Sequence, residues 1–145
     1  VEQSPERNYH VLTRAVDASV VVVYRRCNVD PTMSIAQLAN AARQSARDVS
    51  ARRAVIDMRG NGGGDSSLLL PVIAALRELS ALRAQGAIRV LTNAGTQSSA
   101  LLNAYSLRQD FGATVVGEIA GTALNHFGEV RQLTLPSGRR MTYSS

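Results

Sequence analysis

Short apolar runs alternate with segments of helical periodicity along this chain, and that alternation constrains the fold more than any other feature. The strand-like runs are Tyr9–Val16, Ala18–Cys27, Ala54–Met58, Ile88–Thr92 and Thr114–Gly117. Helical spacing of apolar residues predicts helices over residues 34–47, 69–82 and 98–108. Ser34 and Gln37 have the spacing of a capping box at the start of the first helix, and Gly112 is the expected stop after the third. A hairpin is predicted for Val130–Leu135 and Arg139–Tyr143. Strands that alternate with helices predict an α/β layered fold with a largely parallel sheet and flanking helices.

The length of 145 residues predicts a single domain, residues 1–145, and 45% apolar residues suffice for its core. The chain starts at Val1 and stops just after a predicted strand, so we expect a piece of a longer protein. The single cysteine, Cys27, excludes an intrachain disulfide and a cysteine-cluster metal site. Two histidines far apart, His10 and His126, give no reason to expect a metal, and no motif calls for a cofactor.

The charge balance first suggests nucleic acid, because the net charge is +5 and the sequence pI is about 10.3. However, all 16 basic residues are arginine and they are scattered along the chain. The few aromatic residues form no RNA-binding motif. We therefore expect a solvated arginine-rich surface and no nucleic-acid partner. No apolar run is long enough to span a bilayer, so no transmembrane segment is expected.

A glycine-rich turn follows the strand Ala54–Met58, with four glycines among the five residues 60–64. Such a turn loses much conformational entropy on folding, so a functional reason for it is worth testing. A Walker phosphate loop needs Lys and then Ser or Thr after the glycines, whereas Asp65 stands here. Asp65 also replaces the last glycine of a dinucleotide fingerprint, and the next strand does not end in the acidic residue that binds ribose.

An oxyanion hole is the remaining chemical interpretation of the turn, because backbone N–H groups of glycines can point at one spot. The next strand leads into the serines Ser98 and Ser99, which open a predicted helix. In a parallel sheet both turns lie at the carboxyl edge, so Gly63 and Gly64 are expected near these serines. The structural alternative stays open: the serines can be helix N-caps and the glycines can simply turn the chain.

Three blocks in order resemble the tail-specific, or C-terminal processing, serine peptidases. They are "VIDMRGNGGGDSSLLLPVIAAL", "VLTNAGTQSSALLNA" and "ATVVGEIAGTALNHFGEVRQLTLPSG", and the resemblance extends over roughly residues 18–143. The first is similar to the family's Asp-Leu-Arg-x-Asn-x-Gly-Gly block, the second to its nucleophile segment, and the third to its Gly-Glu-x-Thr-x-Gly segment. The resemblance implies a Clp/crotonase-like α/β core and no cofactor.

The resemblance also implies roles for single residues. Ser98 aligns with the nucleophile, since it follows Gly-Thr-x and begins the helix. The N–H groups of Ser99 and of Gly63 or Gly64 would form the oxyanion hole. Asp57, Arg59 and Asn61 would hold the glycine turn in shape, and Asp57 and Arg59 would be structural rather than catalytic.

The chain departs from the family at the general base, which is normally a lysine about 25 residues after the serine. Residue 123 is Ala, and the chain contains no lysine, so a Ser-Lys dyad within it is impossible. Leu101 also replaces a glutamate that often follows the nucleophile. His126, three residues beyond Ala123, is the candidate base, and His10 is a second one.

The resemblance therefore predicts a serine-type peptidase or peptidase-like hydrolase that acts on polypeptide or peptide substrates. Such peptidases usually carry further domains, and one branch takes a histidine from a separate domain, so other domains or chains would complete the site. Two alternatives remain: a non-catalytic peptide-binding module with the same fold, and a crotonase-like acyl-thioester enzyme. The sequence does not fix a compartment, although relatives are often exported.

Overall fold

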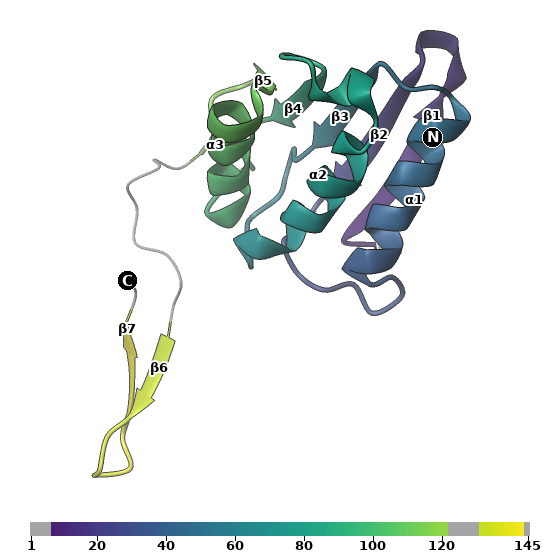
Figure 1. Ribbon diagram of the computed structural model, residues 1–145. Coiled ribbons are helices and arrows are strands. Elements are labelled where there is room, and N and C mark those ends of the chain that lie inside the picture. Colours follow the sequence, from purple (N-terminus) through teal and green to yellow (C-terminus); the bar gives the residue numbers. More distant parts are fainter. Residues whose placement is uncertain (1–6, 122–130, 144–145) are drawn as a thin grey trace.

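The computed structural model describes residues 7–121 and 131–143, which form a five-stranded sheet with three α-helices and a separate two-stranded hairpin (Figure 1). The sheet contains β1 (Tyr9–Arg14), β2 (Ser19–Tyr24), β3 (Arg53–Asp57), β4 (Ile88–Thr92) and β5 (Thr114–Gly117), side by side in that order. β1 pairs antiparallel with β2, and the other neighbours are parallel. The hairpin joins β6 (Arg131–Thr134) to β7 (Arg140–Tyr143). The predicted α/β layered fold with a largely parallel sheet is confirmed.

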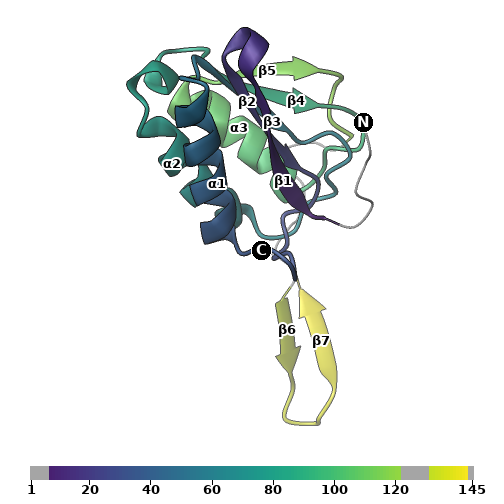
Figure 2. The same ribbon diagram turned by 90° about the vertical axis from the view of Figure 1, so that its right-hand side faces the viewer.

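The helices connect the parallel strands and cover one face of the sheet (Figure 2). They are α1 (Ile35–Asp48), α2 (Leu70–Arg77) and α3 (Ser99–Phe111). One core joins the sheet face to the helices, and its members include Val20, Val22, Ile56, Val90, Leu38, Ile73, Leu76, Ala100 and Leu107. Alternate strand residues such as Val21, Val55 and Leu91 lie on the opposite face and are only half-buried. Burial on one face is what sets the strand register, because a shift by one residue would expose this apolar set.

Local signals set the ends of two helices. Ser34 caps α1, since the Ser34 Oγ accepts from the Gln37 N–H at 3.2 Å and the Gln37 Oε1 accepts from the Ser34 N–H at 2.8 Å. Gly112 ends α3 in the left-handed region, with φ 63°, and donates to the Leu107 carbonyl. Both devices were predicted from the sequence and are confirmed.

The predicted helix over residues 69–82 is wrong in its extent. The segment divides into a 3₁₀ turn η2 (Ser66–Leu69), the two-turn helix α2, and a second 3₁₀ turn η3 (Ser80–Arg83). The break falls at Leu79, whose extended backbone (φ −76°, ψ 121°) ends the helix. The buried leucines of all three pieces face the same sheet, so their spacing continues across a break that periodicity alone does not reveal.

Two stacked tyrosines in the core differ in the hydrogen bonding of their hydroxyl groups. The rings of Tyr9 and Tyr24 lie 6.0 Å apart, and both side chains are fully buried. The Tyr9 hydroxyl donates to the Met33 carbonyl at 2.7 Å and accepts from the Asp30 N–H at 3.1 Å. The Tyr24 hydroxyl lies beside the Cys27 thiol but makes no hydrogen bond of good geometry with any described residue.

Tyr24→Phe is therefore expected to leave the free energy of unfolding unchanged or to raise it by up to about 1 kcal/mol, because it removes a desolvated, unbonded hydroxyl. Tyr9→Phe is the matched control and should lower it by roughly 1–3 kcal/mol, because it leaves two buried groups unbonded. Urea unfolding of both variants measures the difference. A loss of stability in Tyr24→Phe as large as that in Tyr9→Phe would contradict the assignment.

Candidate functional site

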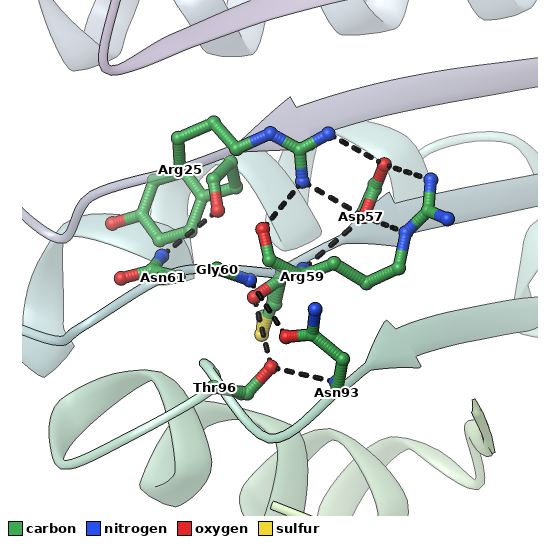
Figure 3. Close-up of polar contacts among 9 residues, drawn as sticks. Arg25, Asp57, Arg59, Gly60, Asn61, Asn93 and Thr96 are labelled. Carbon is green, nitrogen blue, oxygen red and sulfur yellow. Dashed lines mark hydrogen bonds and ion pairs between the residues drawn. The ribbon is translucent and has the colours of Figure 1, made fainter. Parts of the chain in front are cut away.

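Two turns meet at the carboxyl edge of the sheet: the glycine turn after β3 and the turn between β4 and α3 (Figure 3). The Gln97 N–H donates to the Asn61 carbonyl at 2.9 Å, and the Thr96 Oγ1 donates to the Met58 carbonyl at 2.9 Å. The Asn93 Oδ1 accepts from the Gly60 N–H at 2.8 Å. Backbone and side chain therefore bind the two turns together along their length, as the parallel topology predicts.

Ser98 has the most unusual backbone at this edge. It occupies the N-cap position of α3 with φ 51° and ψ −128°, a conformation that residues with a Cβ rarely adopt. The Ser98 side chain does not cap the helix, unlike that of Ser34. Such strain costs about 1–3 kcal/mol and persists where the surroundings impose it, often at functional sites. The N-cap interpretation of this serine therefore explains its position on the helix but not its conformation.

Gly63 lies directly against Ser98. A Cβ built on Gly63 would stand 2.7 Å from the Ser98 Cβ and 3.1 Å from both the Gln97 carbonyl oxygen and the Ser99 nitrogen. The backbone of Gly63 also has φ 103°, which side chains disfavour. Only glycine allows the two turns to approach this closely.

The backbone N–H groups around Ser98 differ in whether they already donate a hydrogen bond. The Gly63 N–H donates to the Asn61 Oδ1 at 2.9 Å. Among the described residues, the Gly64 and Ser99 N–H groups donate to no acceptor. The Ser99 Oγ donates to the Gly64 carbonyl, which joins the first turn of α3 to the glycine turn. The backbone N–H groups of Gly64 and Ser99 are therefore two donors without an acceptor among the described residues.

A carboxylate bound by two arginines supports the glycine turn from its other side (Figure 3). Asp57, at the end of β3, is 4% exposed and accepts two hydrogen bonds from Arg25, at 3.0 and 2.9 Å. It accepts two more from the Arg59 guanidinium, at 2.9 and 2.8 Å. Burial acts to raise the pKa of Asp57, but the hydrogen bonds from Arg59 and Arg25 outweigh it and hold the pKa well below its usual range. The Arg25 Nη1 also donates to the Arg59 carbonyl at 2.7 Å, which fixes the start of the turn.

The third sequence block reaches the same edge. The Glu118 N–H donates to the Thr92 carbonyl at 3.2 Å, and the Thr92 Oγ1 donates to the Glu118 carbonyl at 3.1 Å. A Cβ on Gly121 would contact the Ala94 carbonyl oxygen and would stand 3.2 Å from the Gln97 Nε2, so the chain passes beside the Ser98 turn. Ala123 and His126 lie outside the described residues.

The predicted site residues thus divide into two groups. The structure brings Ser98, Ser99, Gly63 and Gly64 together, while the candidate base His126 lies outside the part that it describes.

His10, the second candidate base, lies on β1, where partial burial and the charges of Arg25 and Arg7 lower its pKa below the ordinary value. Sequence reasoning missed Arg25 and Asn93, because each contacts the turn only after folding.

Two features are absent from the described residues. None of their helices is both long and apolar enough to cross a membrane. They also contain no cluster of three or more His, Cys, Asp or Glu residues suited to a metal ion.

Comparison with known proteins gives structural matches only, since no protein-family model and no curated protein sequence matches the chain. A lipoprotein from Streptococcus agalactiae has a TM-score of 0.60 at 16% identity, over 96% of this chain and 58% of that one. A photosystem II D1 C-terminal processing protease has a TM-score of 0.63 at 14% identity, over 99% and 43%. A proposed peptidase from Parabacteroides merdae has a TM-score of 0.57 at 16% identity, over 95% and 50%.

The chain spans about half the length of the solved structures that it matches. At these low identities the matches establish the fold alone. One of the proteins that share this fold is a processing protease. The chain has a peptidase-like fold.

Proposed function

We propose that this chain is the catalytic core of a serine-type peptidase, or a peptidase-like hydrolase, that acts on polypeptide or peptide substrates. One observation carries the proposal: Ser98 is held at φ 51° at the start of α3, against a glycine turn that offers a neighbouring N–H donor. The resemblance of the three sequence blocks and the peptidase-like fold support the same assignment.

In the proposed reaction the Ser98 Oγ attacks the carbonyl carbon of a substrate amide and passes its proton to a general base. The carbonyl oxygen becomes an oxyanion, which the N–H groups of Gly64 and Ser99 stabilise. We assign this role to Gly64 rather than Gly63, because the Gly63 N–H already donates to the Asn61 Oδ1. The N-terminus of α3 adds a favourable field for the same negative charge.

The second half of the reaction restores the serine. Collapse of the tetrahedral intermediate breaks the C–N bond, and the base returns the proton to the departing amine. Water then attacks the acyl ester with help from the same base, which releases the acid and regenerates the Ser98 hydroxyl. We propose His126 as that base. The alternative is a base supplied by a further domain or by another chain.

A non-catalytic peptide-binding module is the second candidate function. Ala123 and Leu101 favour it, since they stand where the similar family has its lysine and often a glutamate. A module that only binds peptides would keep the fold without activating Ser98. The crotonase-like acyl-thioester alternative has no nucleotide-binding motif in its favour.

A fluorophosphonate probe, which reacts covalently with activated serines, separates the two functions. The wild-type chain should be labelled, and Ser98→Ala should lose the label. Ser106→Ala is the matched control, because Ser106 lies two turns further along α3 and should leave labelling unchanged. If the folded wild-type chain is not labelled, the hydrolase proposal fails and the peptide-binding module replaces it.

The pH dependence of labelling tests the base. If His126 accepts the proton, the rate should fall in acid with a midpoint that reports the protonation of its imidazole. His126→Gln should lower the rate and remove that midpoint. An unchanged pH profile in His126→Gln would assign the base to another group.

A further inference from the structure

A buried chain of polar side chains runs from α3 to the glycine turn, beneath the candidate site. The Asn103 Nδ2 donates to the Cys27 Sγ at 3.8 Å, and the Cys27 thiol donates to the Asn61 Oδ1 at 3.6 Å. That same Oδ1 accepts from the Gly63 N–H at 2.9 Å. The Asn61 Nδ2 donates to the Tyr24 carbonyl at 2.8 Å, which attaches the chain to the end of β2.

The polar side chains that form this connection are buried, so the loss of any one hydrogen bond between them is costly. Cys27 and Asn61 are fully buried, and Asn103 is 6% exposed. Burial raises the pKa of the Cys27 thiol, so the thiol keeps its proton and can donate. Hydrogen bonds to sulfur are weak singly, but a buried amide that loses its partner leaves a desolvated polar group unbonded. An apolar residue at position 27 would therefore break the chain at both of its contacts.

Cys27 also holds the glycine turn through its backbone. The Cys27 N–H donates to the Gly63 carbonyl at 3.1 Å, and the Cys27 carbonyl accepts from the Asp65 N–H at 2.7 Å. These two bonds pair Cys27 with Gly64 as an isolated parallel bridge. The backbone of Cys27 thus fixes the turn, while its side chain reaches across to α3.

Two separate attachments join the first turns of α3 to the glycine turn. Asn103 lies four residues after Ser99 and so shares a face of the helix with it. The Ser99 Oγ joins that face to the Gly64 carbonyl, and Asn103 joins it, through the thiol, to Asn61. Two attachments one helical turn apart restrict how the helix can pivot against the glycine turn, whereas a single attachment would leave that pivoting free.

We propose that Cys27 and Asn103 are positioning residues, which set the rotation of α3 against the glycine turn and thereby the spacing between Ser98 and the two oxyanion donors. This inference rests on the proposed hydrolase function. It assigns a role to Cys27, which is the only cysteine in the sequence. Displacement of a reacting group by about 1 Å can cost on the order of 100-fold in rate, so a small rotation is enough to matter.

The test compares Cys27→Val with Cys27→Ser. Valine fills the thiol's space without a donor or acceptor, whereas serine keeps both. The rate of fluorophosphonate labelling at Ser98 should fall about 10-fold or more in Cys27→Val and stay within a few-fold of wild type in Cys27→Ser. Asn103→Leu should reproduce the valine effect. The double variant should lose less than the product of the two single losses, because both changes break one chain.

Two further readouts separate positioning from general loss of structure. Urea unfolding must show that each variant is folded under the labelling conditions. The backbone amide NMR signals of Gly64 and Ser99 should shift in Cys27→Val and remain near their wild-type positions in Cys27→Ser. A merely structural role would lower stability without this selective shift.

The outcomes distinguish the two proposals. If the wild-type chain is labelled and Cys27→Val is labelled at the same rate, the positioning role is overturned and the hydrolase function stands. If the wild-type chain is not labelled, the hydrolase function fails, and unshifted Gly64 and Ser99 amides in Cys27→Val would overturn the positioning role as well.

Discussion

Gly64→Ala is expected to lower the free energy of unfolding by roughly 3 kcal/mol, from backbone strain together with overpacking. Gly64 has φ 137°, where an alanine is strained wherever it stands. A Cβ at this position would also overlap the Cys27 carbonyl and the Asn28 Oδ1. The Cys27 carbonyl belongs to the β-bridge between Cys27 and Gly64, so the bridge would have to open to relieve the overlap with the added Cβ.

Two neighbouring glycines provide matched controls for this prediction. Gly60 has φ 73° with nothing within 4 Å of its Cβ position, so Gly60→Ala should show the strain alone, about 1 kcal/mol. Gly62 has the same open space without the left-handed backbone, so Gly62→Ala should change stability by less than about 0.5 kcal/mol. Urea unfolding of the three variants should rank them in this order. Equal losses in Gly64→Ala and Gly60→Ala would show that the close approach to Cys27 carries no energy.

Asp57→Asn is expected to cost roughly 3 kcal/mol of stability, the low end of the range for breaking a buried ion pair. The Asp57 side chain is 6% exposed and its carboxylate binds both guanidinium groups, whereas the side chains of Arg25 and Arg59 are 38% and 53% exposed. Solvent would therefore stabilise the two released arginines in part. An asparagine cannot accept the four hydrogen bonds that reach the carboxylate from these guanidinium groups.

Glu78 is the matched control for Asp57, because it also pairs with two arginines. It lies 3.1 Å from the guanidinium groups of Arg43 and Arg47, but its side chain is 45% exposed. Glu78→Gln should therefore change the free energy of unfolding by less than about 1 kcal/mol. Equal losses in Glu78→Gln and Asp57→Asn, measured by urea unfolding at neutral pH, would contradict the importance of burial at Asp57.

The low pKa of Asp57 also predicts how its contribution varies with pH. Because the pKa is lower in the folded state than in the unfolded chain, the carboxylate stabilises the protein above the unfolded pKa, which is about 3.9. That contribution is lost as the pH falls from there toward the folded pKa. The difference in stability between wild type and Asp57→Asn should therefore be constant near neutral pH and shrink in strong acid.

Most of the fold follows from local patterns in the sequence. Strands β4 and β5 have the predicted bounds, and α1 begins where Ser34 and Gln37 form the predicted capping box. These elements were predictable because their signals are local: β-branched runs, capping side chains and a helix-ending glycine. The segment 69–82 was not, because its apolar spacing reflects one shared buried face rather than one continuous helix.

The sequence by itself determined which residues meet at the carboxyl edge. The order of strands and helices puts the glycine turn and the serines of "GTQSS" at that edge, because parallel strands end on the same side. It also determined that no lysine can act in this chain. These conclusions depend only on topology and composition, which a sequence carries directly.

Only the tertiary structure decided how those residues are arranged. The conformation of Ser98, the occupation of the Gly63 N–H by Asn61, and the contact between Cys27 and Asn103 all depend on segments far apart in the chain. Cys27 and Asn103 are 76 residues apart, and neither carries a local motif. Hydrogen bonds of this kind form only once the sheet and α3 are packed, because packing sets the distance and angle that a hydrogen bond requires.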